Sequence, residues 1–147
     1  LGFAKHGRRY AQALDIPLAF IEKRRTDNED HSEALNLIGH VNGHDVLIID
    51  DEIDTGGSIC EAVTEAKANG ALDVYVVFIH PVLSSNAAER LAALPVKHFV
   101  TTNTIPIPDE KLKLFGNRLS ILSIGPLLGE VIKRANEGSS VGAMFNE

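Results

Sequence analysis

The sequence predicts an α/β fold, a three-layer sandwich in which helices cover both faces of a parallel sheet. Apolar runs rich in β-favouring residues, such as 46–49 and 72–79, have the length of buried strands. Segments with helix-favouring residues, such as 59–69 and 126–136, alternate with these runs. Alternating strands and helices are typical of a parallel sheet, because each crossover between parallel strands lays a helix on one of its faces.

Each element is expected from a local signal. Pro17 follows a helix end and Pro126 opens a helix, because proline lacks the N–H that a helix interior requires. Asn42 and Gly43 form a hairpin signal, and the concentration of charge over 22–33 indicates a mobile loop. The predicted elements are, in chain order, a helix over 5–14, a strand over 18–21, the loop over 22–33, a hairpin of 35–41 with 45–49, a helix over 59–69, a strand over 72–79, a helix over 86–94, a strand over 97–100, a loop over 105–114, a strand over 119–124 and a helix over 126–136.

Length and composition predict one globular domain over residues 1–147. The chain has 147 residues, 44% of them hydrophobic, and a mean hydropathy of +0.02, which suits a soluble protein with a substantial core. No apolar run approaches the roughly 20 residues that span a bilayer, and no signal-peptide pattern opens the chain. We therefore expect a cytoplasmic location and no membrane partner.

Charge and cysteine content exclude further classes. A net charge of -6 argues against a nucleic-acid surface, and the one basic cluster, Lys23, Arg24 and Arg25, is too short to follow a nucleic-acid backbone but suits a polyphosphate. The single Cys60 permits no disulfide within one chain, and its helical spacing predicts a buried apolar role in a reducing compartment.

The segment 46–58 (VLIIDDEIDTGGS) carries the strongest functional signal. An apolar strand ends in Asp50 and Asp51, and a loop rich in glycine and hydroxyls leads into a helix. The carboxyl end of a parallel strand is where open α/β sheets bind ligands. Gly56 and Gly57 allow a phosphate to approach the backbone closely, and the first helical amides face it. The carboxylates would repel that phosphate, so they belong on ribose hydroxyls or on a magnesium ion.

Other interpretations of this segment are weaker. It lacks the lysine and spacer of a Walker A motif and the spacing of a dinucleotide fingerprint. It could be only a turn and a helix cap, with Thr55 or Ser58 as the capping residue. It also imitates the acidic strand of a signalling receiver domain, but that class needs another strand-end aspartate, whereas the next buried strand leads to His80 and Pro81.

The same segment resembles the phosphoribosyl-diphosphate binding motif shared by type I phosphoribosyltransferases and ribose-phosphate diphosphokinases. Further segments resemble the diphosphokinases: 19–25 (AFIEKRR) their catalytic flexible loop, 103–106 (NTIP) a late loop, and 122–128 (LSIGPLL) with 137–141 (EGSSV) their carboxyl end. The resemblance runs from residue 1 to about 145. It covers the carboxyl-terminal half of a family whose members consist of two such domains, and it implies a sandwich of the type I phosphoribosyltransferase kind without the family's first strand.

The resemblance implies a role for each site residue. The 5-phosphate of ribose 5-phosphate would be bound by 54–58, and the ribose hydroxyls by Asp50 and Asp51, directly or through Mg²⁺. Catalytic cations would come from Lys23 and Arg25 on the flexible loop. Diphosphate would be bound by Gly2 and Lys5, although Phe3 departs from the paired glycines of that family loop. The members of the 54–58 set are Asp54, Thr55, Gly56, Gly57 and Ser58.

The implied reaction transfers diphosphate from magnesium ATP to ribose 5-phosphate, giving phosphoribosyl diphosphate and AMP. The family's adenine-binding residues and a metal-binding histidine lie in the other half, so none of the histidines here is assigned to that role. His80 could line the cleft, but a histidine satisfied by a nearby carbonyl is the commoner case and is the one expected here. The isolated chain is predicted to bind ribose 5-phosphate weakly and to make no product. The family's hexameric assembly implies that it forms a homo-oligomer, a dimer or higher.

Two related classes remain open. A type I phosphoribosyltransferase would use the same loop for glycosyl transfer, although the strip of Lys23, Arg24 and Arg25 and the carboxyl end differ from that class. A non-catalytic homologue that regulates the synthetase is the other alternative. Retention of Lys23, Arg25 and the acidic loop argues against it.

Overall fold

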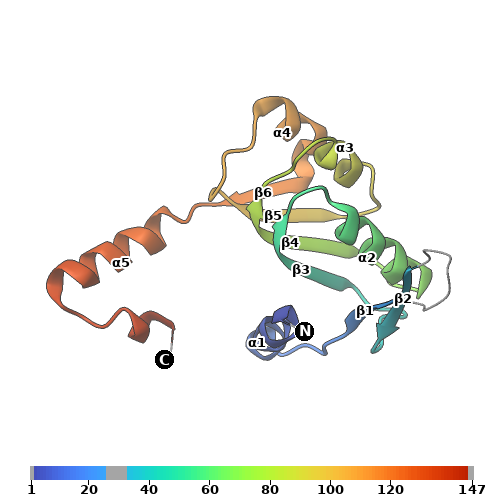
Figure 1. The fold of residues 1–147 in the computed structure, drawn as a ribbon, viewed down its shortest axis with the longest axis horizontal. Helices are drawn as coiled ribbons and strands as arrows, with labels where there is room; N and C mark the ends of the chain where they lie inside the picture. The colour runs from blue at the N-terminus through green and yellow to red at the C-terminus, as the bar shows by residue number, and fades with distance from the viewer. Residues whose placement is uncertain (1, 26–32, 146–147) are drawn as a thin grey trace.

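The structure is a computed structural model that describes residues 2–25 and 33–145, with side chains described for 7–22 and 36–145 (Figure 1). None of the described helices is long and apolar enough to cross a bilayer. In chain order the elements are α1 (Gly2–Leu14), β1 (Phe20–Arg25), β2 (Glu33–Ile38), β3 (Val46–Ile53), α2 (Gly57–Ala68), β4 (Val74–Pro81), α3 (Ala87–Ala92), β5 (His98–Thr102), α4 (Asp109–Phe115), the 3₁₀ turn η1 (Gly116–Arg118), β6 (Leu119–Leu122), α5 (Gly125–Glu137) and the 3₁₀ turn η2 (Gly142–Phe145).

Strands β3, β4, β5 and β6 form a parallel sheet in that order. Ile48 pairs with Val76, which pairs with Phe99, which pairs with Leu119. Helix α2 connects β3 to β4, α3 connects β4 to β5, and α4 connects β5 to β6. The predicted α/β class with a parallel sheet is therefore confirmed.

The main core lies between this sheet and helices α2, α3 and α4 (Figure 1). On β4, Val76 and Phe78 are fully buried, whereas the alternate residues Tyr75 and Val77 are half-buried. The two faces of the sheet therefore differ in burial, as the period of two along a strand requires. The helices contribute small and branched side chains to this core: Ile59, Val63 and Ala66 from α2, and Ala87, Ala88 and Leu91 from α3.

The hairpin predicted across Asn42 and Gly43 is wrong. β2 pairs with β1 in an antiparallel ribbon, whereas β3 pairs with β4 in parallel. The turn before β3 is bonded instead to the segment between α2 and β4, since Gly43 N–H donates to Gly70 O at 2.9 Å and Val46 N–H donates to Asp73 O at 2.8 Å. The hydrogen bonds of this turn therefore hold β3 in the parallel sheet.

The loop predicted over 22–33 is also partly wrong. Residues up to Arg25 belong to β1, and β2 begins at Glu33. The backbone of the charged residues at both ends of this segment is paired, because Glu22 lies opposite Asn36 and Arg25 opposite Glu33. Charge density predicted a loop, but backbone pairing does not depend on side-chain polarity. Residues 26–32 lie outside the described part of the chain.

Helix α4 lies in the predicted loop 105–114. Pro108 precedes it, and Asp109 and Glu110 in its first turn complement the positive end of the helix dipole. The ring centroids of Phe115 and Phe99 lie 5.2 Å apart in an edge-to-face arrangement. A short helix that buries one aromatic side chain lacks the repeated apolar spacing that predicts longer helices.

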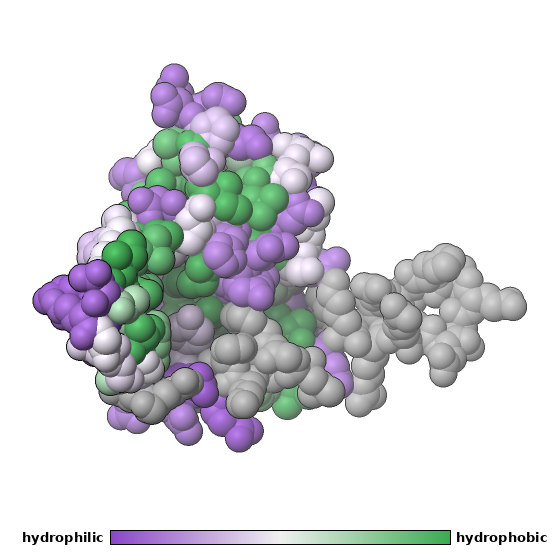
Figure 2. Space-filling view, turned by 60° about the vertical axis from the view of Figure 1, so that its left-hand side comes forward, coloured by the Kyte–Doolittle hydropathy of each residue, from purple (hydrophilic) through white to green (hydrophobic). Residues whose placement is uncertain are grey.

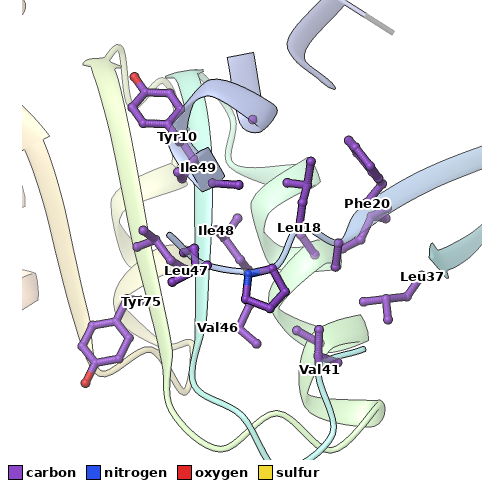
Figure 3. A pocket seen from close by; sticks show the side chains of 18 of the residues that line it. Tyr10, Leu18, Phe20, Leu37, Val41, Val46, Leu47, Ile48, Ile49 and Tyr75 are labelled. Atoms are coloured by element: carbon purple, nitrogen blue, oxygen red, sulfur yellow. The ribbon is translucent and has the colours of Figure 1, made fainter. Parts of the chain in front are cut away.

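A pocket of about 760 Å³ lies beside the outer edge of β3. Figure 3 shows Val46 and Ile48 of β3 on one side, and Leu18 and Phe20 from the amino-terminal segments on the other. Figure 2 shows that hydrophobic side chains gather on one face of the molecule among hydrophilic ones. Within the described residues β3 is therefore an edge strand that faces an apolar pocket instead of a second paired strand.

Candidate functional site

Strand β3 delivers the acidic pair to the carboxyl edge of the parallel sheet. Asp50 lies opposite Phe78 of β4 and is half-buried, whereas Asp51 is exposed. The strand ends at Ile53, which is 2% exposed, so it is longer than the predicted 45–49. The acidic pair is preceded in the strand by the half-buried residues 46–49 and followed by the buried Ile53. Packing of the strand before and after the pair therefore positions both carboxylates.

The environment of Asp50 disfavours its ionised form. Partial burial is the main cause, and the hydrogen-bonded Asp51 side chain and the negative charges of Asp51 and Glu52 add to it. The Asp51 N–H, which donates to Asp50 Oδ1 at 3.0 Å, acts in the opposite direction. Together they raise the pKa of Asp50 from 3.8 to about 6. A bound cation or hydroxyl donors would stabilise the ionised Asp50 and lower this pKa.

The loop after β3 opens α2 without a side-chain cap. Gly56 is the N-cap, with φ of 76°, and no side chain makes a capping hydrogen bond. The alternative in which Thr55 or Ser58 merely caps the helix is therefore wrong, and α2 begins at Gly57 instead of the predicted 59. The first amides of a helix have no partner within it, so those of Gly57, Ser58 and Ile59 remain available to an anion.

Segments from later in the sequence support this loop. Leu83 N–H donates to Ile53 O at 2.9 Å, and Ser84 N–H donates to Asp54 O at 3.0 Å. Arg90 of α3 donates from Nη1 to Thr55 O at 3.2 Å. These three hydrogen bonds hold the carbonyl groups of three successive residues, 53–55, in place.

Sequence reasoning missed Arg90 and a second cation, Lys111. Lys111 Nζ donates to Leu83 O at 2.6 Å, and so holds the segment that in turn holds the loop. Arg90 lies 35 positions from its partner Thr55, and Lys111 lies 28 from Leu83. No local pattern signals contacts at these separations.

His80 lies at the same edge of the sheet, opposite Glu52. Its Nδ1 lies 3.0 Å from Thr104 Oγ1, so its partner is a hydroxyl and the predicted carbonyl partner is wrong. Thr104 Oγ1 donates to Ile79 O at 3.0 Å, and its oxygen can therefore accept from the His80 Nδ1–H. This bond ties the end of β4 to the segment after β5.

The remaining predicted site residues are described only by their backbone. Lys23 and Arg25 lie in β1, and Gly2 and Lys5 lie in α1, where a diphosphate-binding loop was expected. Their side chains lie outside the described residues, and their roles stay predictions. Cys60 is half-buried in α2, less buried than predicted.

Asp50 and Asp51 are the described residues best suited to a divalent cation. No group of three His, Cys, Asp or Glu side chains in the described chain is arranged to hold a metal. Magnesium does not require one, since it is usually held by one or two carboxylates while water and substrate oxygens complete its shell. Two adjacent carboxylates, one half-buried with a raised pKa and one exposed, fit such a shared site.

The geometry combines two kinds of recognition within a few residues. Uncapped amides and the hydroxyls of Thr55 and Ser58 suit a phosphate, whereas the half-buried Asp50 and exposed Asp51 suit sugar hydroxyls or a cation. A ligand with a phosphate at one end and a diol at the other would satisfy both.

A family model described as the phosphoribosyl synthetase-associated domain matches residues 26–146. The chain is 40% identical to the ribose-phosphate pyrophosphokinase of Oceanobacillus iheyensis over 145 residues, which are 99% of this chain and 44% of that protein. It is 42% identical to the ribose-phosphate pyrophosphokinase of Deinococcus radiodurans over 145 residues, covering 98% of this chain and 45% of that protein.

This chain is also similar to a solved structure. The crystal structure of phosphoribosylpyrophosphate synthetase from Mycobacterium smegmatis is similar with a TM-score of 0.83 and 36% sequence identity, over 95% of this chain and 43% of that one. The chain thus spans less than half the length of these similar proteins.

Proposed function

Because the chain belongs to the phosphoribosyl synthetase family, we propose that it carries the ribose 5-phosphate half of a ribose-phosphate diphosphokinase site. The observation that carries this proposal is the uncapped start of α2 directly after the acidic end of β3. The family match and the names of the similar proteins support it. The other half of the site, for ATP, would lie in the part of such proteins that this chain does not span.

In this proposal the loop 54–58 binds the 5-phosphate. The amides of Gly57, Ser58 and Ile59 donate to the phosphate oxygens, and the positive end of the α2 dipole favours the dianion. The hydroxyls of Thr55 and Ser58 add donors at the same place. Asp54 belongs to this set through its place in the motif.

The ribose hydroxyls donate to Asp50 and Asp51, either directly or with Mg²⁺ shared between them. Magnesium, when bound, would neutralise charge on the diphosphate being transferred. The chain's own contribution is to orient the ribose, so that its anomeric hydroxyl is presented to the diphosphate of ATP. Positioning and charge neutralisation account for most catalysis of phosphoryl transfer.

The proposal also includes four residues whose side chains lie outside the described part of the structure. Lys23 and Arg25 would neutralise charge on the transferred group, and Gly2 and Lys5 would bind diphosphate. The products would be phosphoribosyl diphosphate and AMP. A cytoplasmic location, a homo-oligomeric state and the absence of a nucleic-acid partner belong to the proposal as well, the last supported by the net charge of -6.

Calorimetric titration of ribose 5-phosphate into the purified chain, with and without magnesium, tests this function. We expect saturable binding that strengthens with magnesium and is lost in the double variant Asp54→Ala, Thr55→Ala. Both residues are exposed, so the variant should keep its fold, which circular dichroism would check. Equal binding by the variant, or none by the folded wild-type chain, would refute the proposed site.

A further inference from the structure

The phosphate loop is supported from α3 through a single cationic side chain. Arg90 Nη1 donates to the carbonyl oxygen of Thr55 at 3.2 Å, although 35 positions separate the two residues. No other cation whose side chain the structure describes is hydrogen-bonded to this loop. Arg90 has no role in the function proposed above.

The position of the Thr55 carbonyl fixes the direction of the next amide. The peptide bonds described here are trans, and in a trans peptide the C=O and the following N–H point in opposite directions. Because Thr55 O faces Arg90, the N–H of Gly56 faces away from α3. Gly56 is buried, and its N–H makes no hydrogen bond with the described residues, so this donor is left for a ligand.

Without Arg90, this peptide has little to hold it in that direction. Gly56 has φ of 76°, and glycine adopts positive and negative φ about equally well, so the peptide between Thr55 and Gly56 can flip at small cost. A flipped peptide would turn the Thr55 carbonyl oxygen towards the phosphate and repel it.

The charges around the loop also favour a role for Arg90 in phosphate binding. Asp50, Asp51 and Asp54 place negative charge around a loop that is to receive a phosphate dianion. The Arg90 guanidinium places a positive charge beside the Thr55 carbonyl, and this charge offsets part of the repulsion.

We propose that Arg90 is a positioning residue for phosphate binding: its bond to the Thr55 carbonyl orients the Gly56 N–H into the site, and its charge favours the phosphate. The proposal rests on the proposed ribose 5-phosphate function for its ligand, but not for the orientation of the peptide. It predicts that Arg90 affects the phosphate end of the ligand and not the sugar end.

The first test uses the ligand-free chain. In ¹⁵N-labelled protein, Arg90→Gln should shift the Gly56 amide resonance strongly, Arg90→Lys should shift it less, and Glu89→Gln should leave it in place. Glu89 is the matched control because it is an exposed neighbour on the same helix. An unchanged Gly56 resonance in Arg90→Gln would overturn the proposal, whether or not the wild-type chain binds ribose 5-phosphate.

The second test separates the two ends of the ligand by calorimetry. Arg90→Gln should weaken ribose 5-phosphate binding about tenfold and leave ribose binding unchanged, while Arg90→Lys stays within about threefold of wild type. A parallel loss for ribose and ribose 5-phosphate, with a lowered melting temperature, would show a merely structural role and overturn the proposal. If the wild-type chain binds no ribose 5-phosphate, the proposed function fails, and the amide shift alone decides the role of Arg90 in orienting the peptide.

Discussion

At the scale of single residues, the surroundings of two side chains in and beside the proposed site decide what they can do: the pKa of Asp50 is raised, and Arg90 has a backbone partner. Asp50 is an ordinary carboxylate by sequence, yet partial burial and the neighbouring negative charges raise its pKa to about 6. Arg90 is an ordinary surface arginine by sequence, yet it holds Thr55 O. The sequence identified the first by its place in a motif and gave no sign of the second.

The raised pKa of Asp50 predicts a pH-dependent stability. The unfolded chain releases this proton near pH 3.8 and the folded chain near pH 6, so the folded state binds more protons between these values and its stability falls as the pH rises through them. The substitution Asp50→Asn removes the ionisable group, and with it this loss of folding stability at high pH. We expect it to stabilise the chain at pH 7.5 by about 1 kcal/mol, a value reduced for the partial exposure of the carboxylate.

Urea unfolding of both proteins in EDTA, at pH 7.5 and at pH 4, measures this difference. At pH 4 Asp50 is protonated in the folded chain and only partly ionised in the unfolded chain, so most of the loss of stability has not yet developed and the two proteins should unfold at similar urea concentrations. A difference that is equal at the two pH values would contradict the assignment of the effect to Asp50 ionisation.

At the scale of elements, the junction between β3 and α2 holds the proposed phosphate loop. Gly56 is buried with φ of 76°, whereas Gly57 begins the helix without a positive φ. A Cβ on Gly56 would meet Leu91 Cδ2 at 3.7 Å, which is ordinary contact. The requirement for glycine at this position is therefore conformational and not a matter of space.

These two glycines predict opposite effects of the same substitution. Gly56→Ala should destabilise the chain by about 1 kcal/mol, because an alanine in the left-handed region is strained. Gly57→Ala should be neutral or stabilising by a few tenths of a kcal/mol, because alanine favours a helix. Thermal unfolding of the two variants side by side measures the contrast, and equal melting temperatures would contradict the described backbone of this junction.

At the scale of the whole molecule, the described sheet presents the proposed site at its carboxyl edge and leaves the outer side of β3 unpaired. The carboxyl edge of the sheet carries the acidic pair and the proposed phosphate loop, and the outer side of β3 faces an apolar pocket (Figure 3). The chain also spans about 44% of the length of the pyrophosphokinases that it resembles. The isolated chain is therefore expected to bind ribose 5-phosphate without forming product.

We expect the pure chain to release no AMP from magnesium ATP and ribose 5-phosphate, although it binds ribose 5-phosphate. The reason is that the proposed ATP half of the site lies outside it. Chromatographic detection of AMP measures this, with the Asp54→Ala, Thr55→Ala variant as a control for contaminating host enzyme. AMP release by the wild-type chain that the variant lacks would contradict the expectation.

The sequence alone determined the α/β class, the four strands of the parallel sheet and the composition of the proposed phosphate loop. It could do so because buried strands need continuous apolar runs, and because a phosphate loop needs its glycines and hydroxyls next to each other in the chain. Tertiary structure alone decided the rest. The pairing of β3 with β4, the half-burial of Asp50 and the contact of Arg90 with Thr55 all depend on segments far apart in sequence, and the energies of such contacts have no local pattern.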